Sequence, residues 1–187
     1  MNLEELEQEV KKILSEERFY HSKCVMGKCA ELALIYNVDI EKAKKVGIAH
    51  DIAKEMSDEE KRKYIKNNNI EIDEIEERNI GLLHGRIGKD ILIKKYGFDE
   101  EMGNAVAYHS TGKENMTILE KITFLSDDIG EDRTYFDYRE HLENLAKTHI
   151  DEAMIYSMEK RIEYNFKKNK EIHPISILAR NYILNSL

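Results

Sequence analysis

Apolar residues recur along this chain at the three- and four-residue steps of an α-helix. The first such stripe is formed by Leu3, Leu6, Val10, Ile13 and Leu14. A second stripe is formed by Ile118, Ile122, Leu125 and Ile129. A third is formed by Leu142, Leu145, Ala146, Ile150, Ala153 and Met154. This spacing places apolar side chains on one face and predicts amphipathic helices in all three segments.

Helix start signals add further elements. Thr117 with Glu120 three residues later has the form of a capping box. Asp39 predicts the start of a helix that runs to about Met56, and Ser57 opens another that ends near residues 67–69. Strand-like alternation is limited to residues 70–73, and the chain has one proline and nine glycines. The pattern therefore predicts an all-α fold, a single compact helical bundle over residues 1–187.

Composition narrows the class of protein. A length of 187 residues suits one compact domain, and 41% apolar residues can form a sizeable core. The formal net charge of -8 argues against a protein that binds nucleic acid through its phosphates. A small phosphorylated ligand remains compatible, because a bound metal ion can reverse the field inside one cleft.

The two cysteines and the N-terminal segment indicate the compartment. Cys24 and Cys29 fall on different faces of a predicted helix, and no Cys-x-x-Cys pair is present. Residues 1–17 are acidic and amphipathic, unlike a signal peptide. No apolar run approaches the roughly 20 residues that span a bilayer. We expect a soluble cytoplasmic protein with reduced thiols and no membrane or nucleic-acid partner.

The dipeptide His50-Asp51 is the most informative chemical feature. It lies in an apolar, helix-compatible run, where an imidazole and a carboxylate are costly to bury without a partner. A metal ion is one such partner, and these ligand types suit Fe, Mn or Zn. An ion with an open coordination site lowers the pKa of bound water from about 15.7 to about 7. Further candidates are His21, His84, His109 and Asp127.

Any one of these residues alone would be read as a structural side chain. A lone buried histidine is more often a hydrogen-bonded core residue than a ligand, and Asp127 alone would be a helix-surface or capping carboxylate. The order and spacing of the whole set favour a metal site. The remaining histidines, His141 and His149, are interpreted as solvated, and His173 as a loop residue that could line a nucleotide pocket.

The ordered set resembles the HD-domain superfamily of metal-dependent phosphohydrolases. Within it, the chain is most similar to the YqeK-type symmetrical diadenosine tetraphosphate hydrolases. The resemblance covers nearly the whole chain. It is carried by Arg-Phe-Tyr-His-Ser (18–22), Ala-His-Asp-Ile-Ala-Lys (49–54), Leu-Leu-His-Gly (82–85), Tyr-His-Ser-Thr-Gly (108–112), Leu-Ser-Asp-Asp-Ile-Gly-Glu-Asp-Arg (125–133) and His-Pro-Ile-Ser-Ile-Leu-Ala-Arg-Asn (173–181).

The resemblance implies roles for individual residues. The metal ligands would be His21, His50, Asp51 and Asp127. They would hold iron or another divalent transition ion (Mn, Co, Ni or Zn), with one ion favoured and two as in the dinuclear members. The catalytic residues would be Asp51, which orients or deprotonates the attacking water, together with His84 and His109, which face the phosphates or hold the second ion. The substrate-binding residues would be Arg18, Lys54, His84, His109, Ser110 and Arg133, with Thr111 as a further hydrogen-bond donor.

This sequence also departs from the family pattern near the last aspartate. Ser126 stands where alanine is usual, and Gly130-Glu131-Asp132 where Glu-Pro is usual. The departures affect the loop before Arg133 and leave the proposed ligand set intact.

The resemblance implies hydrolysis of a dinucleoside tetraphosphate at its central phosphoanhydride into two nucleoside diphosphates. Two alternatives stay open: an HD-type nucleotide phosphomonoesterase or phosphodiesterase, and a non-catalytic module that senses nucleotides. The expected partner is a small-molecule nucleotide, and a homodimer is compatible with the sequence.

Overall fold

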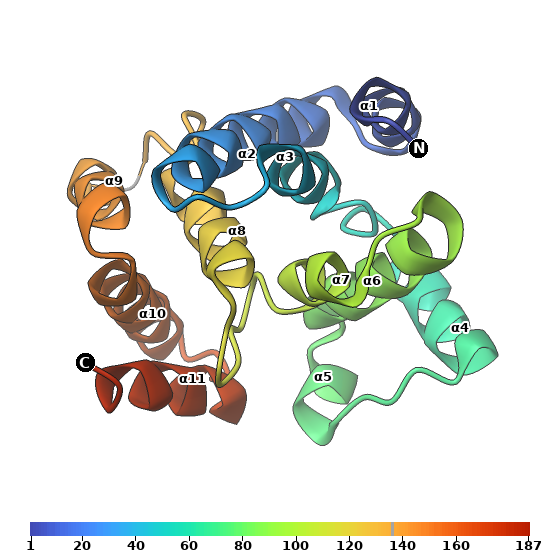
Figure 1. Cartoon of the computed structure of the whole chain (residues 1–187). Coiled ribbons are helices and arrows are strands. Elements are labelled where there is room, and N and C mark those ends of the chain that lie inside the picture. The colour runs from blue at the N-terminus through green and yellow to red at the C-terminus, as the bar shows by residue number, and fades with distance from the viewer. Residues whose placement is uncertain (136) are drawn as a thin grey trace.

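All regular elements that the structure describes are helical, as predicted. The computed structural model describes residues 1–135 and 137–187 (Figure 1). Its elements are α1 (Leu3–Ile13), α2 (Glu16–Ile35), α3 (Ile40–Ala49), α4 (Asp58–Asn68), α5 (Glu74–Arg78), the 3₁₀ turn η1 (Ile80–Leu82), α6 (Leu83–Tyr96), α7 (Glu100–Ala107), α8 (Ile118–Ile129), α9 (Arg139–Thr148), α10 (Ile150–Lys167) and α11 (Pro174–Leu184).

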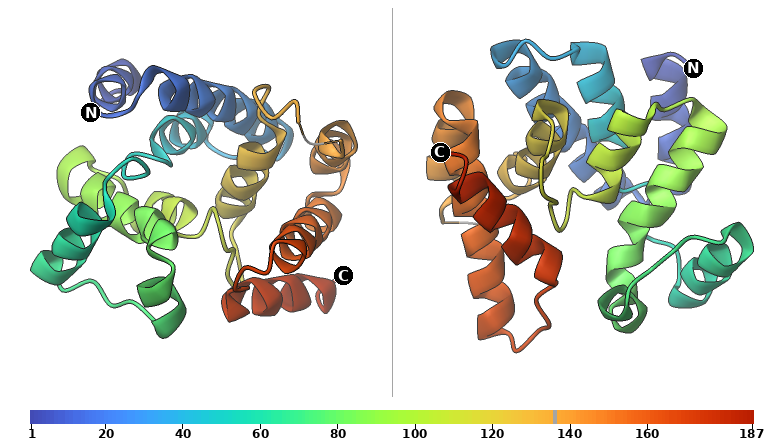
Figure 2. Two further views of the ribbon diagram at one scale, coloured as in Figure 1. Left: turned by 180° about the vertical axis from the view of Figure 1, so that it is seen from behind. Right: turned by 60° about the horizontal axis from the view of Figure 1, so that its bottom comes forward.

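Helices α2, α3, α7 and α8 form the centre of the molecule. Helix α3 packs against α2, α7 and α8, and α2 also contacts α8. The group α4–α6 lies on one side of this centre and the group α9–α11 on the other, in Figure 1 and in both views of Figure 2. None of the described helices is long and apolar enough to cross a membrane. The central helices carry or flank all the predicted metal ligands.

Three predicted helix starts are confirmed by their capping contacts. The Asp39 side chain accepts a hydrogen bond from the backbone N–H of Lys42. Ser57 and Thr117 each form a reciprocal capping box with the glutamate three residues later. Each cap satisfies backbone N–H groups that have no partner inside the helix, which fixes the first turn locally.

Two other predictions were wrong. The helix that begins after Asp39 ends at Ala49 and does not reach Met56; Ile52 and Lys54 instead donate to carbonyls three residues back, which makes tight turns. The stripe from 142 to 154 belongs to two helices, α9 and α10, which are separated by the non-helical backbone of His149 (φ -143°, ψ 76°). The 70–73 segment, the one stretch with strand-like alternation, forms no strand, in agreement with the all-α prediction, and its last residue, Asp73, caps α5.

The close crossing of α2 and α3 depends on Gly47. A Cβ atom at this position would lie 2.7 Å from Met26 Cα and 3.1 Å from Cys29 Sγ. Both cysteines are free thiols, and Cys29 is buried at this crossing. Because Gly47 is one helical turn before His50, the crossing also determines where the His50-Asp51 dipeptide lies.

We expect Gly47→Ala to destabilise the fold by about 1–3 kcal/mol, because the added methyl group meets backbone rather than a flexible side chain. The melting temperature should fall by roughly 2–4 °C for each kcal/mol. Gly27→Ala is the matched control, since a Cβ there meets nothing within 4 Å and alanine favours helix. Thermal unfolding measures the melting temperatures, and an equal fall in both variants would contradict the close packing at Gly47.

Candidate active site

Five buried side chains converge where α2, α3, α6 and α7 meet. His21 comes from α2, His50 and Asp51 follow α3, His84 lies in the first turn of α6, and His109 follows α7. Each is no more than 4% exposed. The rings form a continuous series of edge-to-face contacts, with centroids 5.3 Å apart for His21–His50, 5.0 Å for His50–His109 and 4.9 Å for His84–His109.

The four imidazoles present the same nitrogen to the centre of this cluster. The Nδ1 atom of each faces an acceptor outside it, which assigns the proton to Nδ1. For His50, His84 and His109 the acceptor is the carbonyl three residues earlier, at 2.8, 2.6 and 2.7 Å. Each Nε2 lone pair is therefore available to a ligand, an arrangement typical of histidines that bind metal.

The carboxylate of Asp51 is the centre of the cluster. Its Oδ1 lies 3.3 Å from His84 Nε2 and 3.5 Å from His109 Nε2, while Oδ2 lies 3.5 Å from His50 Nε2. Gly85 allows this convergence, because a Cβ there would lie 2.6 Å from the carbonyl oxygen of Ala107. Helix α6 can thus approach the end of α7 and bring His84 Nε2 within 3.1 Å of His109 Nε2.

The donor set fits a divalent metal ion. His50 Nε2 and Asp51 Oδ1 are buried and have no hydrogen-bond partner among the described residues. Leaving such atoms unpaired costs about 1–3 kcal/mol each, so a ligand is expected there. Two groups, His21–His50–Asp51 and Asp51–His84–His109, each keep their ligand atoms within 4.8 Å of one another. Asp51 belongs to both groups.

Asp127 lies next to the cluster rather than within either group. Its Oδ1 is 3.1 Å from His21 Nε2 and 2.6 Å from Arg133 Nη2. Arg133 also lies 3.3 Å from His21 Nε2. The predicted fourth ligand is therefore held at the edge of the site by His21 and by a guanidinium.

The electrostatics keep both carboxylates ionised. Burial favours the neutral acid and would raise the pKa of Asp51, but the interactions with the surrounding imidazoles of His50, His109 and His84 outweigh burial and hold that pKa well below its usual range. For Asp127, burial is likewise outweighed by the contact with His21 and by the charges of Arg161 and Arg133, so its pKa is also strongly lowered. Burial lowers the pKa of His109 to about 4, so its imidazole is neutral at pH 7. Anionic carboxylates and neutral imidazoles are the protonation states that bind metal.

The predicted phosphate-binding cations border the cluster. Arg18 Nη1 lies 3.0 Å from Asp51 Oδ2, and Lys54 Nζ lies 3.4 Å from His84 Nε2. With Arg133, they place positive charge on more than one side of the site. Ser110 follows His109 and borders a neighbouring pocket, whereas the Thr111 hydroxyl donates to the carbonyl of Gly112 at 3.1 Å.

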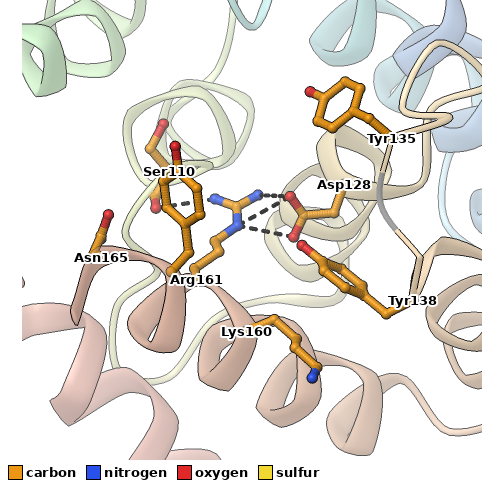
Figure 3. Close-up of a pocket in the computed structure, with 8 residues that line it drawn as sticks. Ser110, Asp128, Tyr135, Tyr138, Lys160, Arg161 and Asn165 are labelled. Carbon is orange, nitrogen blue, oxygen red and sulfur yellow. Dashed lines mark hydrogen bonds and ion pairs between the residues drawn. The ribbon is translucent and has the colours of Figure 1, made fainter. Parts of the chain in front are cut away.

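Sequence reasoning missed Arg161, which braces the site from α10. Its guanidinium lies 2.8 and 2.9 Å from the two carboxylate oxygens of Asp128 (Figure 3). It also lies 3.4 Å from Asp127 Oδ2. It also donates to the carbonyls of His109 and Ser110, each at 3.1 Å. The available signal was an arginine in register with Met154 and Met158 on the buried face of a helix. A charged residue at such a position needs partners.

Asp132, for which the sequence predicted no role, supports His21. Its Oδ2 accepts a hydrogen bond from His21 Nδ1 at 2.8 Å. This contact fixes the ring of the one cluster histidine that does not bond to the carbonyl three residues back. A carboxylate behind a ligating histidine orients the ring and raises its basicity.

We expect Asp132→Ala to weaken metal binding about 10- to 100-fold, because His21 loses the group that orients its Nε2. Competition with a chelator of known affinity measures the change. Glu131→Ala, at an exposed neighbouring position, should bind metal like the parent protein. Equal affinities in the two variants would show that Asp132 does not support the site.

The remaining histidines lie away from the cluster. His141 and His149 are exposed, as predicted. His173 caps the start of α11, accepting from the backbone N–H of Ile175, and its Nε2 lies 2.9 Å from Asp73 Oδ2. It thus has a structural role at the junction of α5 and α11.

Comparisons with known proteins agree with this geometry. A family model described as "HD domain" matches residues 18–132. The chain is 31% identical over 185 residues to the symmetrical bis(5'-nucleosyl)-tetraphosphatase of Bacillus subtilis, and 35% identical over 190 residues to the protein of that name from Halalkalibacterium halodurans. Each alignment covers 98% of both chains. A crystal structure from Clostridium acetobutylicum, described as a predicted HD superfamily hydrolase involved in NAD metabolism, superposes with a TM-score of 0.95 at 33% identity and covers 100% of this chain and 99% of its own.

Proposed function

The chain belongs to the HD domain family, and on this premise we propose that it hydrolyses diadenosine tetraphosphate and related dinucleoside polyphosphates symmetrically into two nucleoside diphosphates. Relatives that carry the name of this activity align over nearly the whole chain. The proposal treats residues 1–187 as one HD-type phosphohydrolase domain. It is carried by one observation: a buried carboxylate, Asp51, shared by two ligand groups and bordered by cations.

The proposed metal ligands are His21, His50, Asp51 and Asp127. The mixed imidazole and carboxylate set suits iron, and also Mn, Co, Ni or Zn. A divalent ion bound there supplies charge that lowers the pKa of a water molecule and neutralises phosphate oxygens. His84 and His109 add two further Nε2 atoms around Asp51, which equips them to hold a second ion or to contact the phosphates.

The side chains of the protein would position and activate the reactants. Asp51 Oδ1 lacks a hydrogen-bond partner among the described residues, so it can accept a hydrogen bond from the attacking water and hold that water in line with an inner phosphorus. Arg18, Lys54 and Arg133 would bind the tetraphosphate oxygens and stabilise the charge on the leaving nucleoside diphosphate. Binding the chain of phosphates from several sides would place the central anhydride bond over Asp51.

The products of diadenosine tetraphosphate test this proposal. We expect ADP as the sole product, with the activity lost in chelator and restored by a transition ion. Equimolar ATP and AMP, or no turnover, would contradict symmetric cleavage. A parallel panel of nucleoside monophosphates and cyclic nucleotides tests the phosphomonoesterase and phosphodiesterase alternatives. Elemental analysis of protein purified without added metal tests the assignment of iron.

A further inference from the structure

A second concave surface adjoins the histidine cluster. It is a pocket of about 630 Å³ between the end of α8, the segment before α9, and α10. Figure 3 shows Tyr135 and Tyr138 on one side, Ser110 and Asn165 on the other, and the Arg161–Asp128 ion pair between them. The lining residues are Ser110, Asp128, Tyr135, Tyr138, Lys160, Arg161, Tyr164 and Asn165.

The pocket and the cluster share a wall. Two pairs of consecutive residues form this wall. In each pair the first residue, His109 or Asp127, lies on the side of the cluster, and the second, Ser110 or Asp128, lines the pocket. The guanidinium of Arg161 contacts both aspartates. The cluster and the pocket therefore lie on opposite sides of the ion pairs that Arg161 forms with these two aspartates.

The chemistry of the pocket fits an uncharged planar group better than a phosphate. At its floor, Arg161 is compensated by Asp128, which also accepts a hydrogen bond from Ser157. The tyrosines Tyr135 and Tyr164 are 65% and 53% exposed, so aromatic surface is open to a ligand. Aromatic faces stack on nucleobases of any kind. The volume lies within the roughly 300–1,000 Å³ of small-molecule sites.

Polar groups around these rings complete a site for a nucleoside. Ser110 offers a hydroxyl group, and the side chain of Asn165 offers both a donor and an acceptor. Lys160 stands near the aromatic wall, with its ammonium 5.8 Å from the centroid of the Tyr138 ring.

We propose that this pocket binds one nucleoside of the substrate, with the base against the tyrosines and the adjoining phosphates directed past Arg161 to the cluster. The proposal rests on the function proposed above, since it assumes a substrate that carries a nucleoside. Tyr164 and Asn165 would contribute to the affinity for the nucleoside, and the cluster would bind the reacting phosphate.

Calorimetric titration of the Mn²⁺-loaded protein with ADP and with pyrophosphate separates the two regions. In Tyr164→Leu, we expect the Kd of ADP to rise about tenfold, which corresponds to about 1.4 kcal/mol. The Kd of pyrophosphate, which lacks a nucleoside, should stay within about twofold of the parent value. Asn165→Ala provides a second pocket variant. Tyr182→Leu is the control, because Tyr182 is a similarly exposed tyrosine, 41% accessible, on α11.

The outcomes distinguish this proposal from the proposed function. If ADP binding weakens only in the pocket variants while diadenosine tetraphosphate is not hydrolysed, the nucleoside pocket stands and the tetraphosphatase assignment falls. If diadenosine tetraphosphate is converted to ADP but neither pocket variant weakens ADP binding, the hydrolase stands and the pocket is overturned. A parallel loss of ADP and pyrophosphate binding in both pocket variants would also overturn it.

Discussion

Replacing Asp51 with asparagine is expected to reduce kcat/KM for diadenosine tetraphosphate by about a thousandfold or more, equivalent to about 4 kcal/mol. Asp51 is the one carboxylate common to both candidate ligand groups. Asparagine keeps the size of the side chain but removes the negative charge and one acceptor oxygen. The variant should therefore lose metal together with activity.

Metal content, activity and thermal stability are measured on the same preparations. Bound metal raises the melting temperature of a protein that binds it only when folded. We expect added Mn²⁺ to raise the melting temperature of the parent protein and to leave that of Asp51→Asn unchanged. Asp58→Asn, at an exposed position in the first turn of α4, is the control. An Asp51→Asn variant with full metal content and activity would refute the role of Asp51.

Arg161→Met is expected to destabilise the metal-free protein by about 3–5 kcal/mol, because it leaves the buried carboxylate of Asp128 without its cation. It also removes the contacts to Asp127 and to the His109 carbonyl, so kcat/KM should fall in the fraction that remains folded. Arg161→Lys should recover only part of the loss, since lysine cannot form the paired hydrogen bonds.

Urea unfolding in chelator measures this change without a contribution from metal. Arg180→Met is the matched control, because Arg180 forms its ion pair with Glu159 at the surface. Removing a surface pair costs at most about 1 kcal/mol. Similar losses for Arg161→Met and Arg180→Met would contradict the bracing role of Arg161.

The helix starts could be predicted because their causes are local. Asp39, Ser57 and Thr117 each cap a helix through a contact three residues away, which a sequence displays directly. The end of α3 at Ala49 was not predictable in this way. After it, the chain turns tightly while the His50 ring bonds back to the Gly47 carbonyl, and the position of that ring depends on α2, α6 and α7.

The same contrast holds for the site. The cluster residues His21, His50, Asp51, His84 and His109 were singled out by residue type and surroundings, a family resemblance implied their roles, and the structure brings them together. Arg161 and Asp132 act through partners that are distant in sequence. Arg161 lies 33 residues from its partner Asp128, and Asp132 lies 111 residues from its partner His21. No local pattern marks such a pairing. Their roles emerged only from the arrangement of α8 and α10 around the cluster.

The central claim, metal-dependent attack of water on an inner phosphorus, is tested most directly in ¹⁸O-labelled water. Protein is stripped with chelator, reloaded with Mn²⁺ and incubated with diadenosine tetraphosphate, and the products are analysed by mass spectrometry. We predict ADP alone, with one ¹⁸O atom in one of the two ADP molecules from each turnover and no product without metal. Labelled ATP or AMP, or the same turnover in the stripped protein, would contradict the account.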